Sequence, residues 1–453
     1  MLALVCSLVL ADASVVTTTG YVDSRTTSAQ TLVNGAPGLT ELAEANAQIK
    51  VVPNERLTVF ADASLFWQHA WFIHGGDRDQ PEYRPTVVLS EAYLDAPVLD
   101  GFRVLVGKKR IVWGSGLAFN PTDVLNPPKD PTDPSFQRAG AYLAEVEWGF
   151  EKVALSIVTA GKVTRQYAGL PAGLVWYPKR QTAESVRGWV ADDRDDEAHF
   201  AVSARLYLLI ADTDVNVTYA FTNLYNDAFR NSSRGGLSLS RVFGALELHG
   251  EASLYSGSAR VESNAGCVDA PMACAATGEP VVSRPELEGT WLNTRALFGG
   301  RYQFNDSALL SVEYYYNGEG HSRAGFQRLA TLAKTSPVLL QQALAGTSDP
   351  GTPQKFSFEP LRRHYLVAQY SKPQIFDDFT ASFAALVSLE DLSMQLVPQV
   401  SWAPKEWLQL TLAVYLPLGG VTAWGVKIGD TNYGEFTLSP TGTRVLGQAR
   451  VFF

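Results

Sequence analysis

The sequence is poor in charged residues and in cysteine. Only 18% of its 453 residues are charged, against about 25% in soluble domains, and Asp plus Glu outnumber Lys plus Arg by 46 to 37. Because phosphate contact needs clustered Lys and Arg, this acidic balance argues against a nucleic-acid partner. After the first dozen residues no apolar run approaches the roughly 18 residues of a transmembrane helix, which excludes a helical membrane protein. Aromatic residues make up 11%, too many for a disordered chain.

Motifs of catalysis and of cofactor attachment are also missing. No serine stands in a G-x-S-x-G elbow, and no C-x-x-C-H haem motif occurs. His69, His74, Asp77 and Asp79 lie in one segment, but their spacing matches no strong metal-binding motif. We therefore expect no catalytic residue, no metal and no cofactor. A Ser–His pair assembled across strands, as in a lipid hydrolase, is the alternative that motifs do not test.

The first 13 residues have the features of a secretory signal. Residues 2–10 form an apolar core and the A-D-A at 11–13 matches an A-x-A cleavage site, but no basic segment precedes the core. We expect a signal peptide over residues 1–13, truncated at its start, with the mature chain beginning at Ser14. A lipoprotein anchored at Cys6 is the alternative, disfavoured by the large residue before that cysteine.

Two cysteines remain once Cys6 is assigned to the signal. Cys267 and Cys274 are separated by six residues in a polar stretch that contains Pro and Gly. In an exported chain this spacing favours a loop disulfide over a metal site or a redox pair.

Apolar side chains recur at alternate positions in many segments of about ten residues. This period of two predicts strands with one apolar and one polar face. Eighteen strands are predicted, over residues 15–24, 43–52, 56–66, 86–96, 101–111, 139–149, 152–160, 198–210, 213–222, 235–243, 246–257, 291–304, 308–317, 362–371, 379–388, 394–402, 407–417 and 444–453.

Short and long connections between these strands alternate. The short turns are built on Pro53-Asn54, Asp100-Gly101, Ala211-Asp212, Asn305-Asp306 and Pro404-Lys405. The long ones are 25–42, 67–85, 112–138, 161–197, 258–290, 318–361 and 418–443. A β-sandwich, the alternative, gives no reason for long loops at one end only. The pattern predicts an all-β fold over 14–453, a closed antiparallel transmembrane β-barrel of 18 strands (16 to 18), with short periplasmic turns and long extracellular loops.

The last predicted strand separates its two faces clearly. Its outer, lipid-facing residues are Val445, Gly447, Ala449, Val451 and Phe453, and its inner residues are Arg444, Gln448 and Arg450. The ending RVLGQARVFF resembles the terminal signal by which Gram-negative outer-membrane barrels are recognised by their assembly machinery. That resemblance implies a bacterial outer-membrane location, a surrounding of outer-membrane lipid, and the assembly machinery as a partner through Phe453.

The third outside loop is the most unusual stretch. Its segment GKKRIVWGSGLAFNPTDVLNPPKDPTDP, residues 107–134, has Gly and Ser around a Trp and then five prolines. It resembles a segment of a poorly characterised group of porin-like outer-membrane barrels, and in porins the third outside loop folds into the lumen and narrows it. The resemblance implies that Trp113, Asn120, Asp123 and Asn126 are constriction or loop-bracing residues. The alternative is that Asp123 and Asn126 cap local turns.

A barrel of about 18 strands encloses a lumen too wide for wall side chains to fill. Alternation predicts charges of both signs on neighbouring strands of its inner face. The predicted pore-lining residues are Glu91, Tyr93, Asp95, Lys108, Arg110, Glu145, Glu147, Arg444, Gln448 and Arg450. They serve either selectivity or only salt bridging within the wall.

These features predict an outer-membrane channel, porin-like, for passive or selective passage of a small hydrophilic or anionic solute through the lumen. Apolar residues at helical spacing over 322–345, interrupted by Pro337, suggest a helical lid. One alternative is therefore a plugged or lidded barrel that transports a polysaccharide or a hydrophobic compound. The other is a surface-exposed structural or adhesion barrel.

Overall fold

The computed structural model describes most of the chain. The described residues are 15–31, 37–54, 56–72, 84–126, 140–161, 174–176, 200–222, 232–257, 262–268, 274, 282–283, 292–335, 361–419, 421–423, 426–428, 434–438 and 441–453. The predicted signal peptide, residues 1–13, lies outside them. Among these residues no helix is long and apolar enough to cross a membrane.

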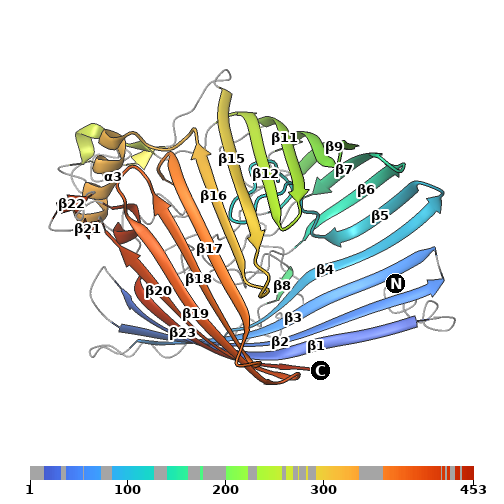
Figure 1. Cartoon of the computed structure of the whole chain (residues 1–453), viewed down its shortest axis with the longest axis horizontal. Helices are drawn as coiled ribbons and strands as arrows, with labels where there is room; N and C mark the ends of the chain where they lie inside the picture. Colours follow the sequence, from blue (N-terminus) through green and yellow to red (C-terminus); the bar gives the residue numbers. More distant parts are fainter. Residues whose placement is uncertain are drawn as a thin grey trace.

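The described strands form one antiparallel sheet of 19 strands and two small two-stranded sheets (Figure 1). Eighteen of the 19 form the wall, each paired with its neighbours along the chain. They are β1 (Val15–Thr31), β2 (Pro37–Asn54), β3 (Leu57–Phe72), β4 (Arg84–Leu99), β5 (Phe102–Lys109), β6 (Ala141–Gly149), β7 (Val153–Gly161), β9 (Phe200–Ile210), β10 (Thr213–Thr222), β11 (Ser232–Phe243), β12 (Leu246–Ser256), β15 (Leu292–Gln303), β16 (Leu309–Asn317), β17 (His364–Ile375), β18 (Phe379–Ser388), β19 (Met394–Lys405), β20 (Leu408–Leu418) and β23 (Thr441–Phe452).

The ring is closed by the first and last strands. β1 pairs antiparallel with β23 from Tyr21↔Phe452 to Thr31↔Thr441, with one irregularity near its end. No wall strand is therefore left with an open edge. The predicted closed antiparallel barrel of 18 strands is confirmed.

The remaining elements lie in the long connections. β8 (Leu174–Trp176) pairs with Val87–Leu89 of β4, beyond the end of β5. The connection after β12 holds the hairpin β13 (Glu262–Ser263) and β14 (Val282–Ser283), the turn η1 (Ala265–Cys267) and a disulfide between Cys267 and Cys274. α3 (Arg323–Thr335) covers the first half of the predicted helical segment, and residues 336–345 lie outside the described part. β21 (Val421–Ala423), β22 (Val426–Ile428) and η2 (Glu435–Leu438) follow β20.

The wall strands are apolar outside and polar inside. Along β7, Leu155 and Ile157 are 39% and 48% exposed, whereas Ser156 between them is fully buried. A protein folded for water has the reverse arrangement, because burial of apolar surface is what stabilises it. The exposed band includes Trp148, Trp402 and Trp407, aromatic residues near short turns, as expected at a membrane interface. The outer face is therefore suited to hydrocarbon.

The turns and the first strands refine the predicted boundaries. Ala211 and Asp212 both have positive φ, at 48° and 58°, which matches the twist of a two-residue hairpin. β2 and β19 run through Pro53-Asn54 and Pro404-Lys405, so those two turns begin just after the predicted dipeptides. The predicted long connection 25–42 is mostly strand, since β1 and β2 leave only residues 32–36 between them.

A buried carboxylate ties the two strands of the closure together. Asp23 of β1 is fully buried, and its Oδ2 accepts hydrogen bonds from Arg25 Nε at 2.9 Å, Arg450 Nη2 at 2.9 Å and Gln448 Nε2 at 2.6 Å. The Arg25 guanidinium also reaches Glu44 of β2 at 3.1 Å. Charge-assisted bonds on the inner face therefore link β23, β1 and β2.

We predict that Asp23→Ala lowers the free energy of unfolding by about 3 kcal/mol, because it leaves the Arg450 guanidinium without its carboxylate. Urea unfolding of the folded barrel in lipid vesicles measures this. Ser24→Ala, on the exposed outer face of the same strand, is the control and should change little. Equal effects of the two substitutions would contradict a role for the Asp23 network in closure.

Candidate functional site

The connection between β5 and β6, called loop 3 here and described over 110–126, folds into the barrel (Figure 1). It contacts the wall on two sides. One contact involves strands from β5 to β10, next to its origin, and the other reaches β17, which is the ninth strand after β5 in the ring of eighteen. Strands nine steps apart stand on opposite sides of such a ring. Loop 3 also contacts β11, β12, β15 and β16 between them, so it extends inside the ring along the inner face, from its origin to the opposite side.

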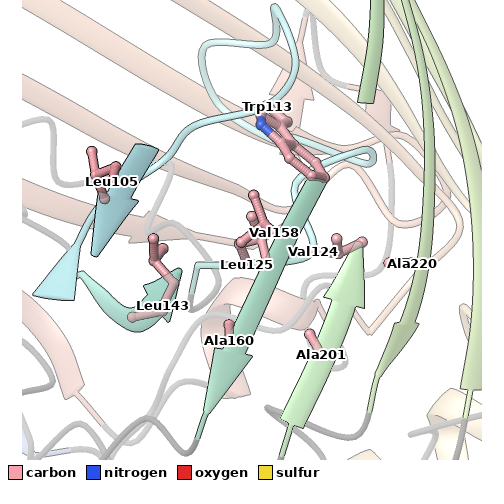
Figure 2. Packing of buried hydrophobic residues seen from close by; sticks show 10 residues of the cluster. Leu105, Trp113, Val124, Leu125, Leu143, Val158, Ala160, Ala201 and Ala220 are labelled. Carbon is pink, nitrogen blue, oxygen red and sulfur yellow. The ribbon is translucent and has the colours of Figure 1, made fainter. Parts of the chain in front are cut away.

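The first contact is an apolar cluster around Trp113. Its indole is 1% exposed and packs with Val124 and Leu125 of the same loop (Figure 2). The wall members of the cluster come from β5, β6, β7, β9 and β10 and are Leu105, Ala141, Leu143, Val158, Ala160, Ala201 and Ala220. Apolar residues on this part of the inner face thus serve loop packing, and the loop is seated on the wall beside its origin.

The second contact depends on Glu251 of β12. Its Oε1 accepts hydrogen bonds from the backbone N–H groups of Ser115 and Gly116, the latter at 2.5 Å. Its Oε2 accepts from the Thr122 hydroxyl at 2.8 Å and the Thr122 N–H at 3.2 Å. One buried carboxylate therefore binds both arms of the loop.

Glu313 of β16 continues the same arrangement. Its two oxygens accept from Leu117 N at 2.6 Å and Ala118 N at 2.8 Å, and His249 Nε2 of β12 lies 2.8 Å from Oε1. Four successive backbone N–H groups, residues 115–118, are thus satisfied by two wall carboxylates. Successive N–H groups of this kind form an anion-binding concavity, here filled by the protein's own side chains.

The tip of the loop packs on aromatic side chains of the far wall. Phe119 stacks on Tyr315 of β16 with ring centroids 4.1 Å apart, and its ring lies 6.2 Å from that of Tyr365 on β17. These residues belong to a buried cluster with Ala118, Leu297, Val367, Leu386 and Phe436. The apolar contact and the carboxylates together fix the loop against the inner face of the wall.

Two glycines permit this close approach. Gly114 has φ +107°, and a Cβ there would lie 2.6 Å from Glu251 Oε1. A Cβ at Gly236 of β11 would lie 2.9 Å from the Thr122 methyl carbon. Both positions must therefore be glycine, because a Cβ at either one would keep the loop away from the wall.

Some predicted pore-lining residues form a charge row on the inner face. The Arg103 guanidinium lies 2.6 Å from Asp95 and 3.6 Å from Glu147. Arg205 of β9, which like Arg103 was not predicted, continues the row at 3.4 Å from Glu147, and its guanidinium stands 5.8 Å from the Trp113 ring centroid. The row spans β4 to β9 and ends against loop 3.

Lys109, the neighbour of the predicted Lys108, makes the inner-face contacts. Lys109 Nζ lies 3.8 Å from Asp95 and 4.5 Å from the Tyr93 ring centroid. Lys108 pairs with Tyr142, on the side of the strand that carries the exposed Val106, and its buried Nζ donates to the Leu89 carbonyl at 2.5 Å. The structure thus gives Lys109 the position predicted for Lys108.

The other predicted inner-face residues are dispersed. Glu91 accepts from the backbone N–H of Arg110 at 2.7 Å, where loop 3 begins. Glu145 of β6 is buried, and it lies opposite Leu105 of β5 and Val158 of β7 in the two strand pairings. On β23, the Arg444 guanidinium stands 4.4 Å from the Tyr415 ring centroid, and Gln448 and Arg450 belong to the Asp23 network.

The predicted polar residues of loop 3 make contacts within the loop. Asn126 Nδ2 donates to the Ile111 carbonyl at 2.6 Å and to Asp123 Oδ1 at 2.9 Å. The Asn120 carbonyl accepts from the Asp123 N–H at 3.1 Å. These bonds join the start of the loop to the turn at 120–126, which fits loop bracing and the capping of local turns together.

Sequence reasoning missed the two residues that matter most to this arrangement. Glu251 and Glu313 lie on inner positions of predicted strands, and an acidic residue in such a position was the available signal. The partners are 136 and 196 residues away in the chain, and strand periodicity carries no information on which loop a wall carboxylate meets.

Solved structures of outer-membrane porins are similar to this chain over nearly its whole length. OccK7 (OpdD) of Pseudomonas aeruginosa has a TM-score of 0.48 and 9% identity, over 97% of this chain and 100% of that one. A Salmonella typhi OmpF complex with daunomycin has a TM-score of 0.42 and 9% identity, over 98% and 99%. A mutant of the Rhodopseudomonas blastica porin has a TM-score of 0.38 and 10% identity, over 97% and 100%. The search of family models and that of curated proteins gave no match.

We predict that Glu313→Ala releases the middle of loop 3. It removes two bonds to a carboxylate, each of about 1.5–3 kcal/mol, so hydrogen exchange at the amides of Leu117 and Ala118 should quicken at least about tenfold. Exchange measured by mass spectrometry over 113–126 checks this. Glu247→Ala is the matched control, because it removes a carboxylate of β12 that faces His249 and Arg301 of the wall, and an equal effect there would contradict the anchor.

Proposed function

We propose that the chain is a channel of the bacterial outer membrane that passes small hydrophilic or anionic solutes and has no enzymatic activity. The observation that carries the proposal is loop 3, which is fixed inside the barrel, against the inner face, by Glu251 and Glu313. A wall that only had to stand in the membrane would need no segment pinned through its interior. A segment held there at both ends narrows the path and sets what passes.

The faces of the wall support the same proposal. Apolar residues are exposed outside, and charged residues of both signs line the inner face beside loop 3, as a water-filled lumen requires. The last residue, Phe453, is 71% exposed at the end of the closing strand and bonds to Gly20 through its backbone. It is available to the outer-membrane assembly machinery, which we propose as the partner during insertion.

The first test of the proposal is single-channel conductance in planar bilayers. Replacing residues 114–125 by a short Gly-Ser linker should raise the conductance, because the segment that occupies part of the lumen is gone. The native chain with its loop intact should conduct steadily at a lower level. A barrel that stays silent with and without this segment would contradict the channel and favour a structural or adhesion role.

A lidded transporter is the second candidate, and α3 favours it. Phe326, Leu329, Ala330 and Leu332 of this helix are buried, so the helix is packed and not simply exposed in the loop. If the helix covers the route, a polysaccharide or hydrophobic compound is the cargo. Removal of 322–345, and not shortening of loop 3, should then open the current.

A further inference from the structure

A short segment near the end of the chain is docked on loop 3. This segment, residues 434–438, includes η2 and lies between β20 and β23 in the sequence. Glu435 and Phe436 are 6% and 4% exposed. Phe436 belongs to the same buried cluster as Phe119, so the segment covers the tip of loop 3 where it meets the far wall.

Backbone and side-chain bonds hold the segment. Glu435 accepts from the Tyr365 hydroxyl, at 2.8 Å to Oε1 and 2.7 Å to Oε2, and its Oε1 accepts from Leu361 N at 2.7 Å. The Glu435 N–H donates to Asp391 Oδ2 at 3.2 Å, and the Phe436 N–H donates to the Ser393 hydroxyl at 3.3 Å. Both bonds to Oε1 persist when Oε2 carries a proton.

The charges that face Glu435 come from two neighbouring segments. Asp391 and Glu390 lie in the turn between β18 and β19, and Arg362 lies just before β17. Arg362 Nε is 2.8 Å from Glu390 Oε2 and 3.8 Å from Asp391 Oδ2. The guanidinium also stands 4.7 Å from the Phe326 ring centroid of α3. The Arg362 guanidinium therefore already contacts Glu390, Asp391 and the Phe326 ring. A charged Glu435 would place another carboxylate beside Asp391, and the two negative charges would repel each other.

We propose that segment 434–438 is a proton-controlled lid over the tip of loop 3, docked when the Glu435 carboxyl is neutral and released when it ionises. As a gate of conduction the lid rests on the proposed channel function. The docking equilibrium itself does not depend on the channel function, because the burial of Phe436 and Glu435 alone defines docking.

The titration of Glu435 agrees with this geometry. Burial raises the pKa of Glu435 to about 8, the Leu361 N–H and the Tyr365 hydroxyl oppose the rise, and Asp391 adds to it. An undocked, solvated Glu has a pKa of about 4.3. The docked form therefore binds its proton more tightly, and docking weakens as the pH rises from the solvated value to about 8. The loss is up to about tenfold in the docking constant for each pH unit.

Exchange of the amide hydrogens of Glu435 and Phe436 tests the lid directly. Both N–H groups donate to the turn between β18 and β19, so they exchange with solvent only when the segment is undocked. The Glu435→Gln variant keeps these amides and has a neutral side chain at all pH values, so it cancels the intrinsic pH dependence of exchange. The ratio of the native rate to the variant rate should rise at least about tenfold between pH 5.5 and 8.5. A constant ratio would overturn the proposal.

The surrounding carboxylates supply the matched control. Glu390→Gln removes a neighbouring carboxylate that pairs with Arg362, so the rise with pH should survive when Glu390→Gln is compared with Glu390→Gln/Glu435→Gln. Loss of the rise in this comparison would assign the pH dependence to Glu390 and overturn the role of Glu435. Gel migration of unheated samples shows that each variant is folded before exchange.

Conductance between pH 5.5 and 8.5 separates the lid from the channel. A native barrel whose open fraction rises with pH, beside a Glu435→Gln barrel whose open fraction stays constant, supports both. An exchange ratio that rises with pH in a barrel without current supports the lid and contradicts the channel. Current with the same pH dependence in both barrels contradicts the lid and supports the channel.

Discussion

The whole structure depends on one constraint, that backbone N–H and C=O groups in hydrocarbon must be bonded to one another. An open sheet edge would leave a row of them unpaired, and each would cost several kcal/mol. The pairing of β1 with β23 removes the last edge. Closure in turn creates an interior that side chains of the wall do not fill, and everything else in the chain is arranged around that interior.

Loop 3 solves a related problem inside the ring. A segment that enters the lumen carries its own N–H groups, and those need acceptors. Glu251 and Glu313 provide them for residues 115–118, while Trp113 and Phe119 anchor the two ends through apolar contact. Each carboxylate is in turn satisfied by the loop, so neither buried charge is left unpaired. The loop and the wall are therefore interdependent.

The sequence predicted the wall well and the interior poorly, for a physical reason. All 18 wall strands follow from a period of two that lipid imposes on the outer face. The first loop, 25–42, was wrong because β1 and β2 continue with polar residues on both faces, where that period fades. Lys108 was assigned to the wrong face of β5: the register with β4 is unbroken from Arg103 to Lys108, so Arg103, Leu105 and Lys109 share the inner face with Asp95. Contacts such as Glu251 with Gly116 join distant parts of the chain and leave no periodic trace.

The central claim is that one side of each wall strand meets hydrocarbon and the other meets the lumen. Spin labels placed singly along β23 in lipid vesicles test it most directly, with dissolved oxygen as the apolar relaxing agent and a nickel chelate as the aqueous one. The account predicts that labels at 445, 447, 449 and 451 relax chiefly with oxygen, and that labels at 444, 448 and 450 do so less. Equal accessibility of both series to the nickel chelate would contradict it.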